Sequence, residues 1–262
     1  MELPRTESLS PRLRILESAG STNDVLSDLV ASGEEPDLST VLTLNQTAGR
    51  GRLGRVWIAP ADKTVAVSVL VSTARPAGFP LGWIPLLAGA AMSASIDALV
   101  GKGRTGLKWP NDVQIDGLKV CGILAELVPS ADAVIVGTGV NLTLEQSELP
   151  VSTATSLLLA GVAERGDALV DLVIGGYLAT LAELLDRLRA ADADAVASGI
   201  HRVVSEWCRT IGREVLVSLP GDKDLYGTAT GIDSTGRLLV RARRTGDTHA
   251  VAAGDVTHLR YE

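Results

Sequence analysis

The sequence is poor in the residues that build disulfide frameworks, metal–thiolate centres and histidine-based active sites. Its two cysteines, Cys121 and Cys208, are far apart and match neither a disulfide framework nor a metal-ligand spacing. We therefore expect two buried free thiols. The three histidines lie outside every motif described below, so none is a candidate site residue: His201, His249 and His258.

The sequence also lacks an excess of positive charge, a leader and an unbroken apolar run. Its formal net charge of -7 argues against general nucleic-acid binding. The first 20 residues contain no apolar core of a signal peptide, so we expect a cytoplasmic protein. The longest apolar run, Leu81–Val100, is interrupted by Pro85, two serines and Asp97. This pattern predicts a helix buried in a globular core, not a membrane span.

The order of the predicted elements indicates an α+β fold, a mixed sheet flanked by helices. Strands are predicted over residues 40–45, 64–72 and 133–140, which are rich in β-branched residues. The letters STND at Ser21–Asp24 fit a capping box, which predicts that a helix begins there. Two further helices are expected between about 166 and 210. Short strands separated by glycine turns follow from residue 211, which predicts a small all-β barrel and a domain boundary there.

A hairpin is predicted where Asp116 and Gly117 stand between apolar residues, because this dipeptide favours a type I′ turn. A two-residue loop pairs Gln114 with Lys119. Asp112 and Lys119 then become diagonal neighbours on one face of the hairpin. The sequence therefore predicts that a carboxylate and an amine converge.

The stretch GRGRLGRVW, residues 49–57, contains the letters of the dinucleotide-binding pattern G-x-G-x-x-G. A dinucleotide site also needs a helix directly after the glycines and an acidic residue about 20 positions later. Here Pro60 and a β-rich run follow instead. We interpret the stretch as a cationic anion-binding loop that repels itself when empty and is ordered by its ligand. Trp57 at its end could pack on a ligand ring or in the core.

Four motifs in order resemble those of the biotin protein ligases: GRGRLGRVW, KWPNDV at 108–113, Lys119 within GLKVCGILAE, and GTGVN at 137–141. The resemblance implies a catalytic domain of the class II aminoacyl-tRNA-synthetase-like fold over residues 1–210 and an SH3-like β-barrel over 211–262. It also implies that biotin and ATP, with Mg²⁺, form biotinyl-5′-adenylate. The biotinyl group then passes to a lysine of a biotin carboxyl carrier domain.

The same resemblance implies roles for individual residues. Lys119, Arg52 and Asp112 are the catalytic candidates, because a carboxylate and a triphosphate repel each other unless fixed cations hold them. The implied biotin-binding residues are Ser21, Thr22, Asn23, Gln46, Gly49, Arg50, Gly51, Arg52, Lys119, Gly122, Gly137 and Gly139. The implied ATP-binding residues are Arg52, Arg55, Trp57, Asn111, Lys119 and Asn141.

Several of these residues have a structural alternative. Asp112 could bind Mg²⁺, deprotonate the acceptor lysine, or only pair with Lys119. Ser21 could serve as a helix cap, and the glycines as strand-end turns. Some biotin protein ligases carry an N-terminal DNA-binding domain and act as repressors. Only 20 residues precede Ser21, so we expect no operator binding.

Two other functions compete with this interpretation. A lipoate or octanoate protein ligase has a similar catalytic fold, but its loop resembles RR-x-x-GGG-x-V-x-HD, which this chain lacks. A non-catalytic protein could bind an anion or RNA phosphates through the arginine–glycine loop. The acidic net charge and the single loop of this kind argue against the second function.

Overall fold

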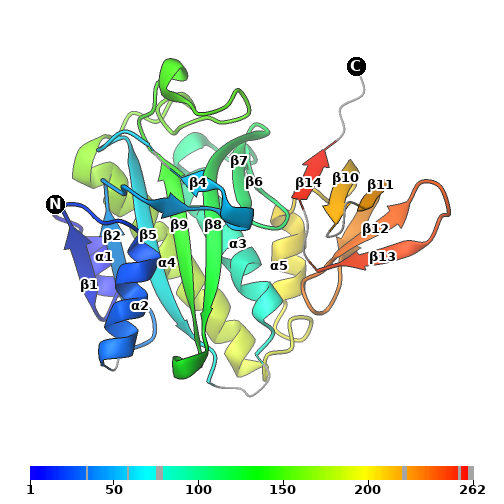
Figure 1. Ribbon diagram of the computed structural model, residues 1–262, viewed down its shortest axis with the longest axis horizontal. Coiled ribbons are helices and arrows are strands. Elements are labelled where there is room, and N and C mark those ends of the chain that lie inside the picture. The colour runs from blue at the N-terminus through cyan, green and yellow to red at the C-terminus, as the bar shows by residue number, and fades with distance from the viewer. Residues whose placement is uncertain (34, 58, 75–78, 220–222, 253–254, 259–262) are drawn as a thin grey trace.

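The computed structural model describes residues 1–262 except 34, 58, 75–78, 220–222, 253–254 and 259–262. Its main element is a mixed seven-stranded sheet with the order β1-β2-β5-β9-β8-β7-β6 (Figure 1). Only the β1–β2 pair is parallel among the strands of this sheet in the described part of the chain. The strands are β1 (Leu13–Leu16), β2 (Thr40–Thr43), β5 (Thr64–Ser72), β6 (Thr105–Lys108), β7 (Asp112–Ile115), β8 (Leu118–Val128) and β9 (Ala133–Asn141). The predicted mixed sheet is confirmed.

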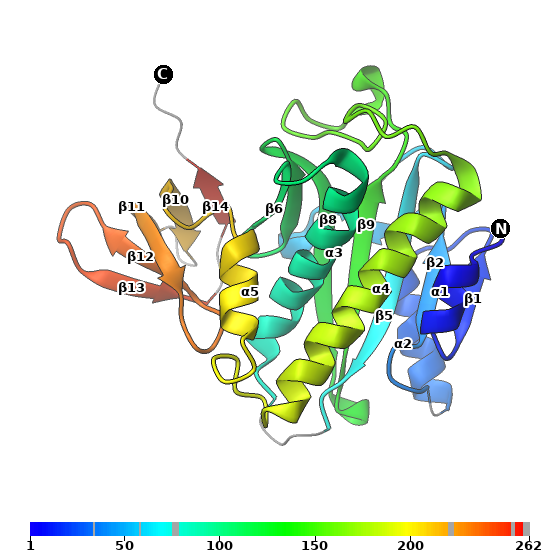
Figure 2. The same ribbon diagram turned by 180° about the vertical axis from the view of Figure 1, so that it is seen from behind.

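Helices cover one face of this sheet (Figure 2). They are α1 (Pro4–Leu9), α3 (Ile84–Val100, after a short 3-10 turn η2 at Leu81–Trp83), α4 (Gly166–Ala190) and α5 (Ile200–Trp207). The 81–100 segment and α4 are long and apolar enough to cross a membrane by length and composition, yet 67% and 61% of their most apolar windows are buried inside the molecule. Both belong to the core, and the prediction of a buried helix at 81–100 is confirmed.

Alternation along the central strand β5 separates this core from the opposite face of the sheet. In β5 the side chains of Val65, Val67 and Val69 enter the main hydrophobic cluster with α3 and α4. The residues between them face the other way, toward α2 (Thr22–Ser32) and the site described below. Helix α2 covers only part of that second face (Figure 1). The uncovered part is where the candidate site lies.

The C-terminal strands form a separate antiparallel sheet with the order β13-β12-β11-β10-β14. Its strands are β10 (Glu214–Leu219), β11 (Lys223–Ile232), β12 (Leu238–Ala242), β13 (Thr248–Val251) and β14 (Asp255–His258). The short strands expected after residue 211 are therefore present.

Two tryptophans from the larger part of the chain donate hydrogen bonds to the turn between β11 and β12. Trp83 Nε1 donates to the Ser234 carbonyl at 2.9 Å, and Trp109 Nε1 donates to the Gly236 carbonyl at 3.2 Å. Both tryptophan side chains are almost completely buried. These bonds fix the C-terminal sheet beside the edge of the main sheet that carries β6 and β7.

Candidate active site

The predicted hairpin forms and brings a carboxylate to an amine. Gln114 pairs with Lys119, and both turn residues, Asp116 and Gly117, have positive φ. Lys119 Nζ lies 2.7 Å from Asp112 Oδ1. The register also shifts by one residue after this pair, so that Asp112 lies opposite Gly122. The predicted convergence of Asp112 and Lys119 is therefore confirmed, with a β-bulge that the sequence did not indicate.

Small residues from three adjacent strands form the floor of a cavity. Gly139 of β9 lies opposite both Ala66 of β5 and Gly122 of β8, while Gly137 lies opposite Ser68. A Cβ atom on Gly139 would come within 2.6 Å of the Trp57 ring, and one on Gly137 would collide with the Asn23 amide. The missing side chains thus make room for Trp57 and Asn23 above the floor.

A short ribbon of β3 (Gly49–Arg50) and β4 (Val56–Trp57) crosses this floor, joined by a 3-10 turn, η1 (Arg52–Gly54). This ribbon is the GRGRLGRVW stretch. Among the described residues, β4 and then β5 follow its glycines in place of an α-helix, so the rejection of a dinucleotide fingerprint is confirmed. The Trp57 ring is half-buried against the floor, with Lys119 Nζ at 5.6 Å from its centroid. Trp57 therefore packs on the sheet and lines the cavity at the same time.

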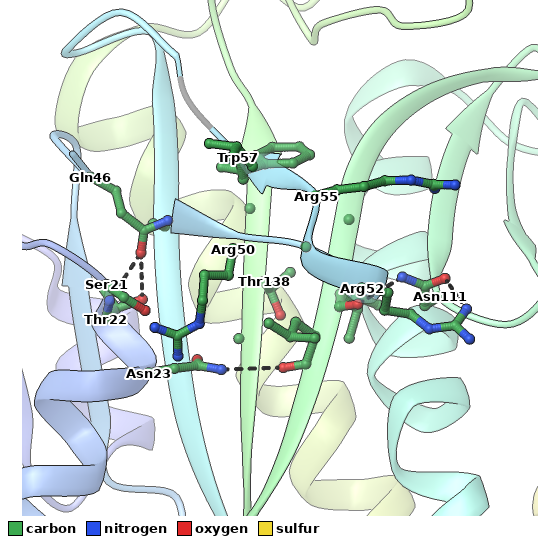
Figure 3. Close-up of a pocket in the computed structure, with 18 of the residues that line it drawn as sticks. Ser21, Thr22, Asn23, Gln46, Arg50, Arg52, Arg55, Trp57, Asn111 and Thr138 are labelled. Carbon is green, nitrogen blue, oxygen red and sulfur yellow. Dashed lines mark hydrogen bonds between the residues drawn. The ribbon is translucent and has the colours of Figure 1, made fainter. Parts of the chain in front are cut away.

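Cations gather at one end of the cavity (Figure 3). Arg52 Nη1 donates to Asn111 Oδ1 at 3.1 Å. Burial lowers the pKa of Arg52, as the neighbouring Arg55 also does, while Asp112 opposes both. Burial likewise lowers the pKa of Lys108, again against the effect of Asp112. Lys119, Arg52 and Lys108 thus all interact with Asp112, and Arg55 adds a fourth positive charge near Arg52 and Lys108. This arrangement is suited to an anionic ligand.

Polar side chains line the other end of the cavity. Gln46 Oε1 accepts hydrogen bonds from the backbone N–H of Thr22 at 2.9 Å and from its hydroxyl at 3.2 Å. Ser68 Oγ lies 2.7 Å from Thr22 Oγ1 and 2.6 Å from Asn23 Oδ1. Asn23 Nδ2 in turn donates to Glu126 Oε2 at 2.5 Å. This chain of hydrogen bonds fixes donors and acceptors that can recognise a small planar polar group.

The structure corrects two expectations about the loop and the start of α2. Ser21 is the N-cap of α2, but its side chain makes no capping hydrogen bond, and Asp24 is turned toward Arg50 instead of completing a capping box. Arg50 Nη1 and Nη2 each donate to an Asp24 oxygen at 2.6 Å. The charge of Arg50 is therefore compensated, and repulsion within the loop is confined to Arg52 and Arg55.

The space between the lining residues is about 830 Å³, which includes the solvent at the open mouth of the cavity. All the predicted site residues line it except Gly49 and Asn141. Gly49 lies beside it, where a Cβ atom would collide with Gln46 Nε2 and the Trp57 carbonyl. Asn141 is buried, and its amide donates to the Thr155 carbonyl at 2.8 Å, so it holds the following loop and does not face the cavity.

Comparison with known proteins identifies the family. Residues 15–141 match the Biotin/lipoate A/B protein ligase family, and residues 210–259 match the Biotin protein ligase C terminal domain. The chain is 38% identical to the biotin--[acetyl-CoA-carboxylase] ligase of Mycobacterium tuberculosis over 95% of its own length and 90% of that protein. The chain belongs to the biotin protein ligase family. A second member, the biotin--[acetyl-CoA-carboxylase] ligase of Paracoccus denitrificans, is 34% identical over 77% of the chain and 83% of that protein.

The fold of this biotin protein ligase family member is also that of solved structures. The biotin protein ligase of Aquifex aeolicus, in a complex with biotin and ATP, superposes with a TM-score of 0.74 at 24% identity, over 96% of this chain and all of that one. The expected biotin protein ligase fold, with its SH3-like C-terminal domain, is therefore confirmed.

Sequence reasoning missed several residues of the family member's site. Thr138, Val56 and Leu124 line the cavity. Asp24, Ser68 and Glu126 hold residues that line it. Strand alternation from Gly137 and Gly122 could have placed Ser68, Leu124 and Glu126 on the site face. The position of Asp24 depends on a tertiary contact, which no local pattern indicates.

Proposed function

We propose that this protein is an ATP-dependent biotin protein ligase that forms biotinyl-5′-adenylate and then transfers biotin to a lysine of a carrier domain. The observation that carries the proposal is the cavity itself, with a fixed polar end at Gln46 and Thr22 and a cationic end at Lys119 and Arg52. An acid with a planar polar head and a carboxylate tail matches these two ends. The relatives named as biotin--[acetyl-CoA-carboxylase] ligases support biotin and a carboxylase carrier as substrates.

In the first step, a biotin carboxylate oxygen attacks the α-phosphorus of ATP, and the bond to the leaving pyrophosphate breaks. Both reactants are anions, so their approach requires positive charge at the point of contact. Lys119 and Arg52 supply that charge. Asp112 holds Lys119, and Asn111 holds Arg52. Because the two cations are already in place, little free energy is spent on moving them as the charge develops in the transition state. No side-chain nucleophile is needed.

We assign the ring systems of biotin and ATP to different parts of the cavity. The ureido group of biotin would meet Ser21, Thr22 and Gln46, and the apolar part of biotin would lie on the glycine floor. The Trp57 ring, which lies over the glycine floor, would stack on the nucleobase of ATP. The roles of Arg55 and Asn111 in ATP binding are part of the same proposal.

Magnesium fits this site only as an ion that arrives with the nucleotide. The described residues contain no group of three or more His, Cys, Asp or Glu side chains arranged for a metal. Asp112 is the single carboxylate among the cavity-lining residues. Mg²⁺ is commonly held by one or two carboxylates together with substrate phosphates, so Asp112 would be its protein ligand. Bound there, the ion would neutralise charge on the phosphates.

In the second step, the amine of the carrier lysine attacks the biotinyl carbonyl carbon, and the bond from that carbon to AMP breaks. The attacking amine must first lose a proton, because a free lysine has a pKa of about 10.4. Asp112 Oδ1 lies beside Lys119 at the cationic end and can accept this proton. This assignment and the location of the reaction in the cytoplasm belong to the proposal.

The decisive experiment measures pyrophosphate release and biotinyl-5′-adenylate together. Purified protein is incubated with ATP, Mg²⁺ and biotin, and lipoate and octanoate serve as control acids. We expect stoichiometric adenylate with biotin alone. Adenylate with lipoate or octanoate would favour the related ligase activity, and no adenylate with any acid would leave an anion-binding protein without ligase activity.

A further inference from the structure

Arg50 is held by two carboxylates from different elements, although it belongs to the loop that crosses the cavity. Its Nη2 donates to both oxygens of Glu126 at 3.3 and 3.2 Å, in addition to the two bonds to Asp24. Asp24 comes from α2 and Glu126 from β8. A forked guanidinium between two carboxylates is a directional contact that a lysine cannot reproduce.

We propose that Asp24 and Glu126 are positioning residues for biotin, which act by clamping Arg50 and so fixing the loop across the biotin end of the cavity. This inference rests on the proposed function, because it assigns a ligand to that end. Neither carboxylate needs to touch the substrate. We call the three side chains, Arg50, Asp24 and Glu126, the acid clamp.

The loop is held at two points on opposite sides of the cavity, as Figure 3 shows for Arg50 beside Asn23 and Arg52 beside Asn111. Between these points the loop closes on itself, because the Gly51 N–H donates to the Arg55 carbonyl at 2.7 Å. Loss of the acid clamp removes the side-chain contact at the biotin end, where the chain just before the loop keeps the backbone hydrogen bond from Ala48 to the Gly20 carbonyl. The biotin end of the loop is then held less firmly, while the Arg52–Asn111 contact at the cationic end stays.

Glu126 also links the acid clamp to the polar end of the cavity. Its Oε2 accepts from Arg50 and from Asn23, and Asn23 continues the hydrogen bonds to Ser68. A movement of Arg50 therefore affects the Asn23 amide, which lines the cavity. This shared acceptor explains why a contact outside the cavity can affect how biotin is held.

The acid clamp consists of partly exposed ion pairs, so its energetic contribution is that of a well-formed surface salt bridge. Exposed side-chain fractions are 42% for Arg50, 55% for Asp24 and 38% for Glu126. The pKa of Asp24 is lowered chiefly by its hydrogen bonds from Arg50. Exposed pairs contribute modestly, and the bidentate geometry places this one at the upper end, so removing one acid should weaken biotin binding about five-fold.

The test uses the full-length protein and measures biotin affinity by equilibrium dialysis, biotin dissociation by dilution chase, and adenylate formation in a single turnover. The variants are Asp24→Asn, Glu126→Gln, Arg50→Lys and Arg50→Met, with both acid variants repeated in the Arg50→Met background. The matched control is Asp116→Asn, because Asp116 pairs with Arg104 at 2.7 Å on the surface of the hairpin, outside the cavity. Asparagine tolerates the positive φ of this turn.

We expect the acid variants to raise the dissociation constant and dissociation rate of biotin about five-fold, while single-turnover adenylation at saturating biotin changes less than about two-fold. Arg50→Lys should also raise the dissociation constant and the dissociation rate of biotin, because it keeps the charge but loses the fork. In the Arg50→Met background Asp24→Asn should have no further effect, whereas Glu126→Gln should keep only the smaller effect of its contact with Asn23. Asp116→Asn should match the wild type.

Two results would overturn the acid clamp. One is wild-type biotin affinity in both acid variants, and the other is an undiminished loss of affinity from Asp24→Asn when Arg50 is already methionine. If Asp24→Asn unfolds at the assay temperature, Glu126→Gln and Arg50→Lys decide the question. If the wild type itself neither binds nor activates biotin, the proposed function fails too, whereas a normal wild type with unaffected variants refutes only the clamp.

Discussion

Gly137 lies where a single added methyl group should disturb the polar end of the cavity. A Cβ atom at this position would collide with Asn23 Oδ1 and lie 2.9 Å from the rest of the amide. Asn23 is 5% exposed, so its amide has little room and must rotate away. In rotating it would lose its hydrogen bonds with Ser68 and Glu126. Gly137→Ala therefore tests whether this chain of hydrogen bonds is as rigid as the structure shows.

The magnitude follows from the bonds that are lost. A neutral hydrogen bond contributes about 1 kcal/mol and one to a charged group about 2 kcal/mol. Replacing glycine by alanine also stabilises the protein by about 0.5–1 kcal/mol, because it lowers the conformational entropy of the unfolded chain. Gly137→Ala should thus lower the free energy of unfolding by about 2 kcal/mol, equivalent to roughly 4–8 °C in melting temperature.

The assay is equilibrium urea unfolding, accompanied by biotin titration, because Asn23 also lines the cavity. Gly231→Ala is the control, since a Cβ atom at this strand glycine would have its nearest neighbour 4.0 Å away. Asn23→Ala removes the obstructing amide, so the double variant should be no less stable than Asn23→Ala alone. Additive losses, or a loss in Gly137→Ala below about 0.5 kcal/mol, would refute the reasoning.

Three further predictions concern charged groups. Lys119→Ala should lower the rate of biotinyl-adenylate formation about 10²–10³-fold in single-turnover assays, with a smaller change in biotin affinity, and an equal loss in both would contradict an electrostatic role in the reaction. Asp112→Asn should slow both half-reactions, and wild-type rates in both would remove it from the catalytic set. Glu35→Gln should cost about 2 kcal/mol of unfolding free energy near neutral pH, because the 4%-exposed carboxylate of Glu35 pairs with Arg14 at 2.9 Å. That pairing lowers the pKa of Glu35, so this contribution is complete above the ordinary carboxyl pKa of about 4.3 and is lost as the pH falls through the lowered value; a pH-independent difference in urea unfolding would contradict it.

Local patterns were sufficient for the hairpin, whereas the glycines of the cavity floor were named through the family resemblance. The Asp116-Gly117 turn fixes the register by its own backbone angles, so the approach of Lys119 to Asp112 could be deduced from spacing. The helix at 81–100 could be assigned because its interruptions argued against a membrane span. The fold as a whole was reached through the family resemblance, which four separate motifs carried.

Long-range contacts account for what the sequence did not reveal. Arg50 was expected to repel its neighbours, but its partners lie 26 and 76 positions away in the chain. Asn141 follows the cavity-facing Gly139 by two residues, so strand alternation alone would place it on the same face. Its amide donates instead to the carbonyl of Thr155, in the loop that follows the strand. Neither outcome follows from periodicity, because each depends on which segment the fold brings alongside.

The two indole contacts that attach the C-terminal sheet have a consequence for tolerance to mutation. Trp83 and Trp109 donate to main-chain carbonyls, which every residue type possesses. The side chain at Ser234 can thus change without loss of the attachment. Two glycines are exceptions. Gly236 has positive φ and a Cβ atom there would lie 2.9 Å from the Gly82 carbonyl oxygen, while a Cβ atom on Gly82 would lie 2.6 Å from the Thr235 carbonyl oxygen. The attachment therefore depends on the two donors and on these two glycines, while the side chain at Ser234 can vary.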